Sequence, residues 1–116
     1  SEAGVDPAAI YEMVIVCNPV MHHLFLGVDP VELGQAPFAL ATSSSLSIDA
    51  REVDLTALNR SARVYVLPCI AGHVGADAAA VALAEEPQKS DEMVLIVDVG
   101  TNAEILLGNK SRVLAC

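Results

Sequence analysis

Short apolar segments separated by turn residues make up most of this chain. Residues 13–17 form a continuous apolar run rich in β-branched side chains, a pattern typical of a strand that is buried on both faces. Residues 93–97 are also continuously apolar and predict the clearest buried strand of the chain. Residues 63–67 predict a further strand, which Pro68 closes. The apolar pattern therefore predicts buried strands distributed along the whole chain.

Helical segments follow two of these strands. Asn18 is a favourable N-cap and Pro19 suits the first helical position, so residues 20–26 predict a short helix that Gly27 ends. Residues 76–84 are nearly all Ala, Val and Leu and predict a second helix. Loops are expected at residues 31–40, 42–47, 70–75 and 88–92, and residues 49–59 fit either an irregular strand or a short helix.

The C-terminal part of the chain predicts an antiparallel meander. The strand at residues 93–97 is followed by a turn at residues 98–102 and a return strand at residues 103–107. Residues 108–110 are Gly-Asn-Lys and predict a second turn before a third strand at residues 111–115. Together with the earlier strand–helix units, this meander indicates an α/β fold.

The first turn of this meander is the strongest candidate for a functional site. A buried strand delivers the carboxylate of Asp98 to the edge of a sheet, and Gly100, Thr101 and Asn102 follow. Successive main-chain N–H groups in such a turn bind anions, and glycine lets a phosphate approach closely. Asp98 repels phosphate itself, so its chemical use is to hold Mg²⁺, or a water in the Mg²⁺ shell, beside the phosphates. The alternative is an ordinary hairpin with an Asp-x-Gly turn.

Glu104 is a second candidate, one residue into the return strand. If Ile105 and Leu107 face the core, Glu104 shares the opposite face with Leu106, near the turn. In that position it can orient a water, although a solvated surface glutamate fits the pattern equally well.

Residues 72–77 lead into the second helix and supply further candidates. A helix N-terminus favours an anion, so Gly75 and Asp77 are candidates for the site, where Asp77 would position water or metal. Asp77 equally fits a first-turn carboxylate that complements the helix dipole. His22 and His23 are neighbours on the first helix, so their side chains diverge and shared metal ligation is not expected.

Composition narrows the possible partners. The chain has 116 residues, 53% of them hydrophobic, and a mean hydropathy of +0.50. That is more apolar sequence than a single domain of this size readily buries. We therefore expect the chain to be a piece of a longer protein that packs on the rest of its own polypeptide, or to form a homo-oligomer.

Charge, hydropathy and cysteine content argue against nucleic-acid, membrane and thiolate-cluster functions. The net charge of −9, with scattered Lys and Arg, argues against nucleic-acid binding. No apolar run approaches the roughly 20 residues of a membrane span, so no membrane partner is expected. Cys17, Cys69 and Cys116 form no Cys-x-x-Cys pair and indicate buried thiols in a reducing, cytoplasmic setting.

Four segments, taken together and in order, resemble a known family. They are Met-His-His-Leu-Phe-Leu-Gly-Val-Asp-Pro at residues 21–30, Gly-Gln-Ala-Pro-Phe at 34–38, Pro-Cys-Ile-Ala-Gly-His-Val-Gly-Ala-Asp at 68–77 and Asp-Val-Gly-Thr-Asn-Ala-Glu at 98–104. From residue 14 to 116 the chain is similar to the C-terminal ATPase region of the reductive activators of corrinoid proteins. These ferredoxin-like proteins belong to the superfamily of acetate kinase, sugar kinases, heat-shock chaperones and actin. The resemblance implies a partial actin-like, ribonuclease-H-like ATPase domain.

The resemblance also implies a reaction and its cofactors. Members of the family use ATP to drive reduction of a corrinoid cobalt centre and carry a 2Fe-2S cluster in an N-terminal ferredoxin domain. We expect that cluster in the parent protein and not in this piece. Asp98, Gly100, Thr101 and Asn102 match the second phosphate loop of the superfamily, so the resemblance implies that they bind ATP with Mg²⁺.

By the same resemblance, residues 1–92 would end the first ATPase subdomain and residues 93–116 would begin the second with the phosphate-loop hairpin.

The sequence departs from the family pattern at two positions. Asn18 lacks the flanking Gly and Thr of the family, which weakens it as a phosphate contact, and Ala103 replaces a Gly. Alanine would be strained there if the loop required a positive φ.

The leading hypothesis is thus a fragment of an ATP-dependent reductive activator of corrinoid proteins. We expect the fragment alone to be inactive, because the first phosphate loop is missing from it. One alternative is a non-catalytic module that docks a corrinoid protein on an actin-like scaffold. Another is a different kinase of the same superfamily.

Overall fold

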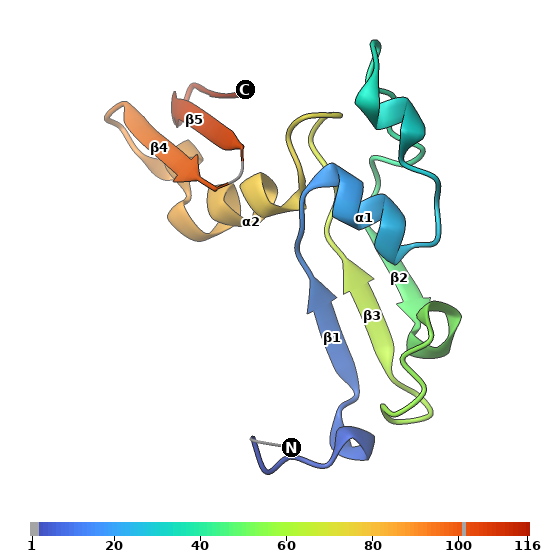
Figure 1. The fold of residues 1–116 in the computed structure, drawn as a ribbon. Coiled ribbons are helices and arrows are strands. Elements are labelled where there is room, and N and C mark those ends of the chain that lie inside the picture. Colours follow the sequence, from blue (N-terminus) through green and yellow to red (C-terminus); the bar gives the residue numbers. More distant parts are fainter. Residues whose placement is uncertain (1–2, 101) are drawn as a thin grey trace.

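Two small sheets joined through two helices form the framework of the molecule (Figure 1). The computed structural model describes residues 3–100 and 102–116. One sheet has the strand order β1-β3-β2 and the other β4-β5-β6. The helices are α1 (Pro19–Phe25) and α2 (Ala76–Glu85), and the strands are β1 (Glu12–Ile15), β2 (Leu46–Asp49), β3 (Arg63–Val66), β4 (Val94–Val99), β5 (Ala103–Asn109) and β6 (Arg112–Ala115).

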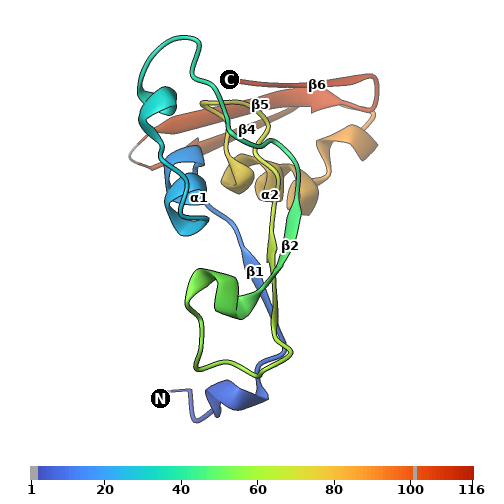
Figure 2. The same cartoon turned by 90° about the vertical axis from the view of Figure 1, so that its right-hand side faces the viewer.

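These elements confirm a mixed α/β arrangement. Figure 2 shows both helices at the junction of the two sheets, with the second sheet above them and the first sheet below. None of the helices that the structure describes has the length and apolar character that crossing a bilayer requires.

The main hydrophobic core packs against one face of the first sheet. Its central strand, β3, runs parallel to β1 and antiparallel to β2. The opposite face carries Val14 and Tyr65, which are exposed. The prediction that residues 13–17 are buried on both faces is therefore wrong for this chain, because only one side of the sheet is covered. The fully buried members of the core are Ala50, Ala62, Val64 and Val66.

Both predicted helices are present: α1 begins and ends one residue earlier than the predicted range 20–26, and α2 begins at the predicted residue and ends one residue later. The side-chain oxygen of Asn18 accepts a hydrogen bond from the Met21 N–H at 2.9 Å, and Pro19 is the first helical residue. Gly27 follows α1 with φ +69°, a left-handed conformation that glycine adopts without strain. α2 ends just before Pro87, which cannot continue a helix.

The undecided segment at residues 49–59 combines both alternatives in part. β2 ends at Asp49, and a 3₁₀ turn at Ala50–Val53 follows it. Asp49 and Glu52 form a reciprocal capping box at the start of this turn. The loop predicted at residues 42–47 is too long, since β2 already begins at Leu46.

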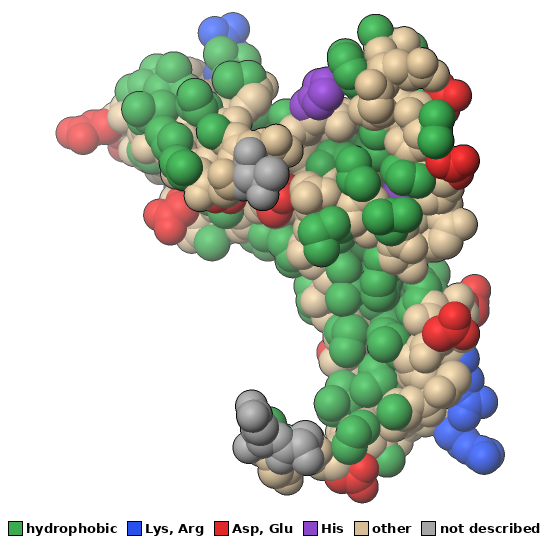
Figure 3. Space-filling view, in the orientation of Figure 1, with side chains coloured by type: hydrophobic (Ala, Val, Ile, Leu, Met, Phe, Trp, Pro, Cys, Tyr) green, Lys and Arg blue, Asp and Glu red, His purple; other side chains and the backbone are tan. Residues whose placement is uncertain are grey.

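The second sheet is the predicted meander, but it is not buried on both faces. β5 pairs antiparallel with β4 on one side and β6 on the other. Leu95, Val97 and Val99 are 63%, 51% and 78% exposed, so the outer face of β4 is open to solvent. Figure 3 shows apolar side chains gathered over this sheet. The prediction of a buried strand at residues 93–97 is therefore wrong for its outer face.

The inner face of the second sheet is the reverse of the one considered from sequence. Leu106 is buried, whereas Ile105 and Leu107 are exposed. β5 lies against α2 and the 3₁₀ turn Pro87–Lys89, which explains the burial of Leu106. Because side chains two residues apart share a face, Glu104 lies on the inner side with Leu106.

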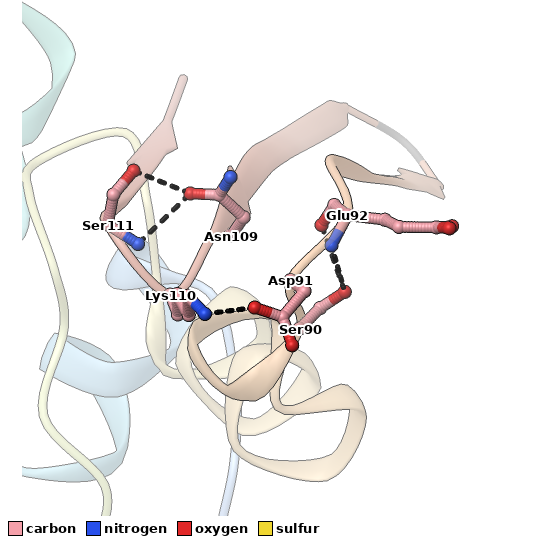
Figure 4. Close-up of polar contacts among 6 residues, drawn as sticks. All are labelled: Ser90, Asp91, Glu92, Asn109, Lys110 and Ser111. Carbon is pink, nitrogen blue, oxygen red and sulfur yellow. Dashed lines mark hydrogen bonds and ion pairs between the residues drawn. The ribbon is translucent and has the colours of Figure 1, made fainter.

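Polar contacts fasten the β5–β6 turn to the segment before β4 (Figure 4). The main-chain N–H of Lys110 donates to the Ser90 carbonyl at 2.8 Å, and the Lys110 ammonium pairs with Asp91. Within the turn, the N–H and hydroxyl of Ser111 both donate to Asn109 Oδ1. The ion pair is mostly exposed and contributes little to stability, so the main-chain bond is the more important restraint.

Burial of the thiols is confirmed for two of the three cysteines. Cys17 and Cys69 are buried and Cys116 is exposed, and all three are free. Burial raises the pKa of the Cys17 and Cys69 thiols, so both stay protonated and unreactive near neutral pH.

Candidate functional site

A cavity of about 150 Å³ lies where the second sheet meets the N-terminal ends of α1 and α2. Three segments that are far apart in the sequence meet around it: the end of β1 with the start of α1, the first turn of α2, and the β4–β5 turn. All the lining residues are ones that the sequence predicts for the site. They are Asn18, Asp77, Asp98, Gly100, Asn102 and Glu104.

Two further residues, Thr101 and Gly75, were also predicted for the site. Thr101 lies outside the described residues. Gly75 is buried next to the cavity, where a Cβ atom would lie 2.5 Å from Asp77 Oδ1 and 2.8 Å from the Asn18 Cα. Glycine at this position therefore allows the start of α2 to approach the start of α1. A hydrogen bond of 3.0 Å from the Ala76 N–H to the Cys17 carbonyl holds this junction.

Asp98 and Glu104 face each other directly across β4 and β5. Both are half-buried on the inner face of the sheet. Cross-strand partners have Cβ atoms about 5 Å apart, and like charges in such a pair repel. Among the described residues, no hydrogen-bond donor or cation offsets this repulsion at either carboxylate. The pair is therefore suited to receive a cation or a hydrated cation.

The two polar atoms of the Asn18 side-chain amide have different roles. Its oxygen caps α1, as described above, so its orientation is fixed by the helix. Its amide nitrogen has no partner within the described part of the chain and is a free hydrogen-bond donor at the cavity wall. A free N–H donor suits an anion, so the loss of the flanking Gly and Thr leaves this residue in a usable position.

The β4–β5 turn presents main-chain groups to the cavity. The N–H of Gly100 donates to the Asn102 carbonyl at 2.8 Å. A Cβ on Gly100 would meet only that carbonyl oxygen, 3.7 Å away, so the space beside this residue is open to a ligand. Neither Gly100 nor Ala103 has a positive φ. Ala103 therefore carries no backbone strain from a positive φ, and β5 begins at this residue.

The cavity is acidic. Asp77, Asp98 and Glu104 contribute carboxylates, and no lining residue is Lys or Arg. No group of three or more metal-binding side chains is close enough to enclose a metal ion in residues 3–100 and 102–116. The donor set fits a hydrated Mg²⁺ held through water by one or two carboxylates, which is how proteins commonly bind this ion together with phosphates.

A second cavity adjoins the first and was not foreseen from the sequence. It measures about 130 Å³ and shares Asn18, Asn102 and Glu104 with the first cavity. The loop before α2 contributes His73, which the sequence did not indicate as a site residue. The neighbouring glycines at 72 and 75 were the available signal, because they mark a tightly packed turn. The other lining residues are Pro19, Val20, Leu33 and Gly72.

His22 and His23 have a structural role. Both side chains are buried, which agrees with packing in the interior. The Ala41 N–H donates to His23 Nε2 at 3.0 Å, so Nδ1 carries the proton and donates to the Pro19 carbonyl at 2.9 Å. Neither ring nitrogen of His22 makes a hydrogen bond of normal geometry to a described residue. Burial, together with the neighbouring His23, lowers the pKa of His22, although the Leu67 carbonyl favours its protonated form.

Comparisons with known proteins place this geometry in a wider context. The family described as the RACo middle region matches residues 1–90. The chain is 38% identical over 108 residues to the corrinoid activation enzyme RamQ of Eubacterium limosum, covering 93% of this chain and 18% of that protein. A solved structure of a reductive activator for corrinoid, iron-sulfur protein matches with a TM-score of 0.93 and 35% identity, over 99% of this chain and 18% of that one. The chain thus spans less than a fifth of the length of either relative.

Proposed function

This chain belongs to the RACo middle region family, and from that premise we propose that it forms part of an ATP-dependent reductive activator of corrinoid proteins. In this proposal the whole protein couples ATP hydrolysis to reduction of corrinoid cobalt, and a corrinoid protein is its partner. The similarity to two corrinoid activators supports the proposal. The observation that carries the ATP-binding part is the single cavity lined by six of the predicted site residues.

The proposed roles follow from the donor atoms around the cavity. Main-chain N–H groups at Thr101 and Asn102, with the free amide of Asn18, would donate hydrogen bonds to the phosphates. The N–H of Gly100 is already bonded to the Asn102 carbonyl, so Gly100 would contribute the open space in which a phosphate approaches the turn. Asp98 would hold a water of hydrated Mg²⁺, and Glu104 would orient a second water. When bound, Mg²⁺ neutralises phosphate charge. Without that ion, the acidic cavity would repel ATP.

Gly75 and Asp77 would complete the site from the side of α2. Gly75 allows α2 to begin next to Asn18, so the first turn of the helix reaches the cavity. The Asp77 carboxylate accepts a hydrogen bond from the Ala78 N–H at 2.9 Å through Oδ1. Its other oxygen has no partner among the described residues and would accept from a metal-bound water.

The proposal assigns the chain to an actin-like, ribonuclease-H-like ATPase. Residues 1–92 would close the first subdomain and residues 93–116 would open the second. The change from one sheet to the other between β3 and β4 supports this division. The exposed apolar faces of both sheets are consistent with burial against the rest of a longer polypeptide or a second copy.

The 2Fe-2S cluster of the family does not fit the residues of this chain. The chain has three cysteines, of which two are buried and one is exposed, and four thiolates are the usual ligand set. In the proposal, the cluster belongs to another part of the protein.

The test is ATP turnover by the full-length protein carrying Asp98→Asn. We expect turnover to fall about 100-fold, because positioning and charge neutralisation of the phosphates supply most of the catalysis in phosphoryl transfer. Asp91→Asn is the matched control, since Asp91 is an exposed carboxylate paired with Lys110 outside the cavity. Turnover that is equal in the two variants would remove Asp98 from the mechanism.

A second candidate function is supported by the open outer face of the second sheet. Leu95, Val97 and Val99 form an apolar surface that suits protein docking. A non-catalytic module would use this scaffold to hold a corrinoid protein without binding nucleotide. Full-length protein that binds the corrinoid protein but shows no ATP binding would favour this candidate. The corrinoid activators among the relatives speak against the third hypothesis, another kinase of the superfamily.

A further inference from the structure

His73 lies at the tip of a tight turn and lines the second cavity. The Val74 N–H donates to the Ala71 carbonyl at 3.0 Å, and the Ala71 N–H donates back to the Val74 carbonyl at 3.0 Å. Gly72 and His73 are therefore the two central residues of a four-residue turn. His73 is exposed, and neither of its ring nitrogens bonds to another residue in the described part of the chain. The imidazole is thus free to act on a ligand.

The turn that carries His73 is held in a fixed place. A Cβ on Gly72 would lie 2.0 Å from the Phe38 carbonyl oxygen, so only glycine lets the two loops approach this closely. The Phe38 ring packs on the imidazole with 4.1 Å between ring centroids and 57° between planes. This contact restricts the imidazole without occupying its nitrogens. Such a pre-positioned polar group is typical of a binding residue.

The charges around His73 make it distinctive. Glu104, from β5, lines the same cavity, and Asp77 and Asp98 line the adjoining one. α1 contributes only uncharged side chains to these walls, and the residue packed on the imidazole, Phe38, is also uncharged. His73 is therefore the one side chain around the two cavities, as far as the structure describes them, that can carry a positive charge.

We propose that His73 is a phosphate-binding residue of this site, donating a charged hydrogen bond to the terminal phosphates of the bound nucleotide. The inference rests on the proposed function, because it takes the adjoining cavity as the place of the Mg²⁺-bound phosphates. The two cavities share Asn18, Asn102 and Glu104 in their walls, so a polyphosphate bound in the first cavity would extend toward His73 in the second. An imidazole donates a charged hydrogen bond only in its protonated form, so the experiment below compares two pH values.

Calorimetric titration of Mg-ATP into the full-length protein, at about pH 6 and about pH 8, tests the proposal. We expect His73→Gln to bind about tenfold more weakly than the wild type at the lower pH and equally at the higher pH, since a charged hydrogen bond is lost. His73→Arg should keep tight binding at both values. Lys89→Gln is the control, because it removes a positive charge at a residue that lines neither cavity and pairs with Glu86. The protonation state of ATP also differs between these two pH values, but this difference affects the wild type and all variants equally.

The outcomes separate this proposal from the one on which it rests. Wild-type protein that binds Mg-ATP, Asp98→Asn that does not, and His73→Gln that matches the wild type at both pH values would overturn the role of His73 alone. Wild-type protein that does not bind Mg-ATP would overturn both. A loss of affinity in His73→Gln that is equal at both pH values would indicate a merely structural role and would also contradict the proposal.

Discussion

The two sheets of this molecule are of similar size but differ in how they are held. The first sheet buries Val64 and Val66 completely in a core shared with the turn after β2. The second sheet buries Leu106 as its one large side chain among the described residues, at 2% exposure, and leaves an apolar outer face open. Both sheets leave one apolar face exposed, and the first does so at Val14 and Tyr65. They differ on the covered face, where the first sheet packs on a core of several buried residues and the second depends mainly on Leu106.

This difference bears on the proposed site, which lies at the junction of the two. Asn18 and Asp77 are positioned by the helices next to the first sheet, and Asp98 and Glu104 by the second sheet. The site geometry thus depends on how firmly the second sheet is seated on α2. Leu106 is two residues from Glu104 on the same face, so its packing sets the position of the acidic pair.

The largest expected effect comes from removing that packing. Leu106→Ala should reduce the free energy of unfolding by about 3 kcal/mol, through lost burial and a residual cavity. Val64→Ala is the counterpart in the first sheet and should cost about 2 kcal/mol. Hydrogen exchange on each variant locates the damage. We expect Leu106→Ala to raise exchange in β5 and spare β3, and equal loosening of both sheets would show that they form one cooperative unit.

A smaller effect is expected on the outer face, and it depends on what covers that face. Leu95→Lys should change the stability of the 116-residue chain by less than about 0.5 kcal/mol, because the side chain is exposed there. In the full-length protein we expect a loss of about 2 kcal/mol from burying the charge. Ser111→Lys is the control, on an exposed turn of the same sheet. An unchanged melting temperature of full-length Leu95→Lys would show that the face stays open.

The pH dependence of stability should be governed on the side of the first sheet by His22. Its pKa is lowered from 6.5 by burial, so the unfolded chain binds more protons between the folded pKa and about 6.5. Stability from this group is full above about pH 6.5 and falls as the pH drops toward the folded pKa. His22→Phe should therefore flatten the fall in stability at acid pH, measured by urea unfolding at a series of pH values. A fall that persists in His22→Phe would assign it to other groups.

The sequence predicted most elements because their signals are local. Asn18 and Pro19 mark the start of α1 by their own chemistry, and Pro87 marks the end of α2. It could not predict which faces are covered, since an apolar run such as residues 93–97 carries no information about the neighbour it meets. The inner orientation of Glu104 was missed for the same reason. It depends on α2 packing against Leu106, a contact made across the fold.

The candidate site shows the same division. The residues of the β4–β5 turn were predicted from adjacent signals, and Asn18 and Asp77 from the caps of two helices. That these segments meet around one cavity could not be derived, because it depends on tertiary packing at Gly75. His73 was not predicted as part of the site. Its position depends on the close approach of Gly72 to Phe38, which lie far apart in the sequence.

The central claim is that the β4–β5 turn and the starts of α1 and α2 together bind the phosphates of ATP. A crystal structure of the full-length protein with Mg²⁺ and a non-hydrolysable ATP analogue tests it most directly. We predict phosphate oxygens within hydrogen-bond distance of the main-chain N–H groups after Asp98 and a metal-bound water on the Asp98 carboxylate. A nucleotide bound elsewhere, with the cavity between Asn18 and Glu104 closed or filled by protein, would contradict the account.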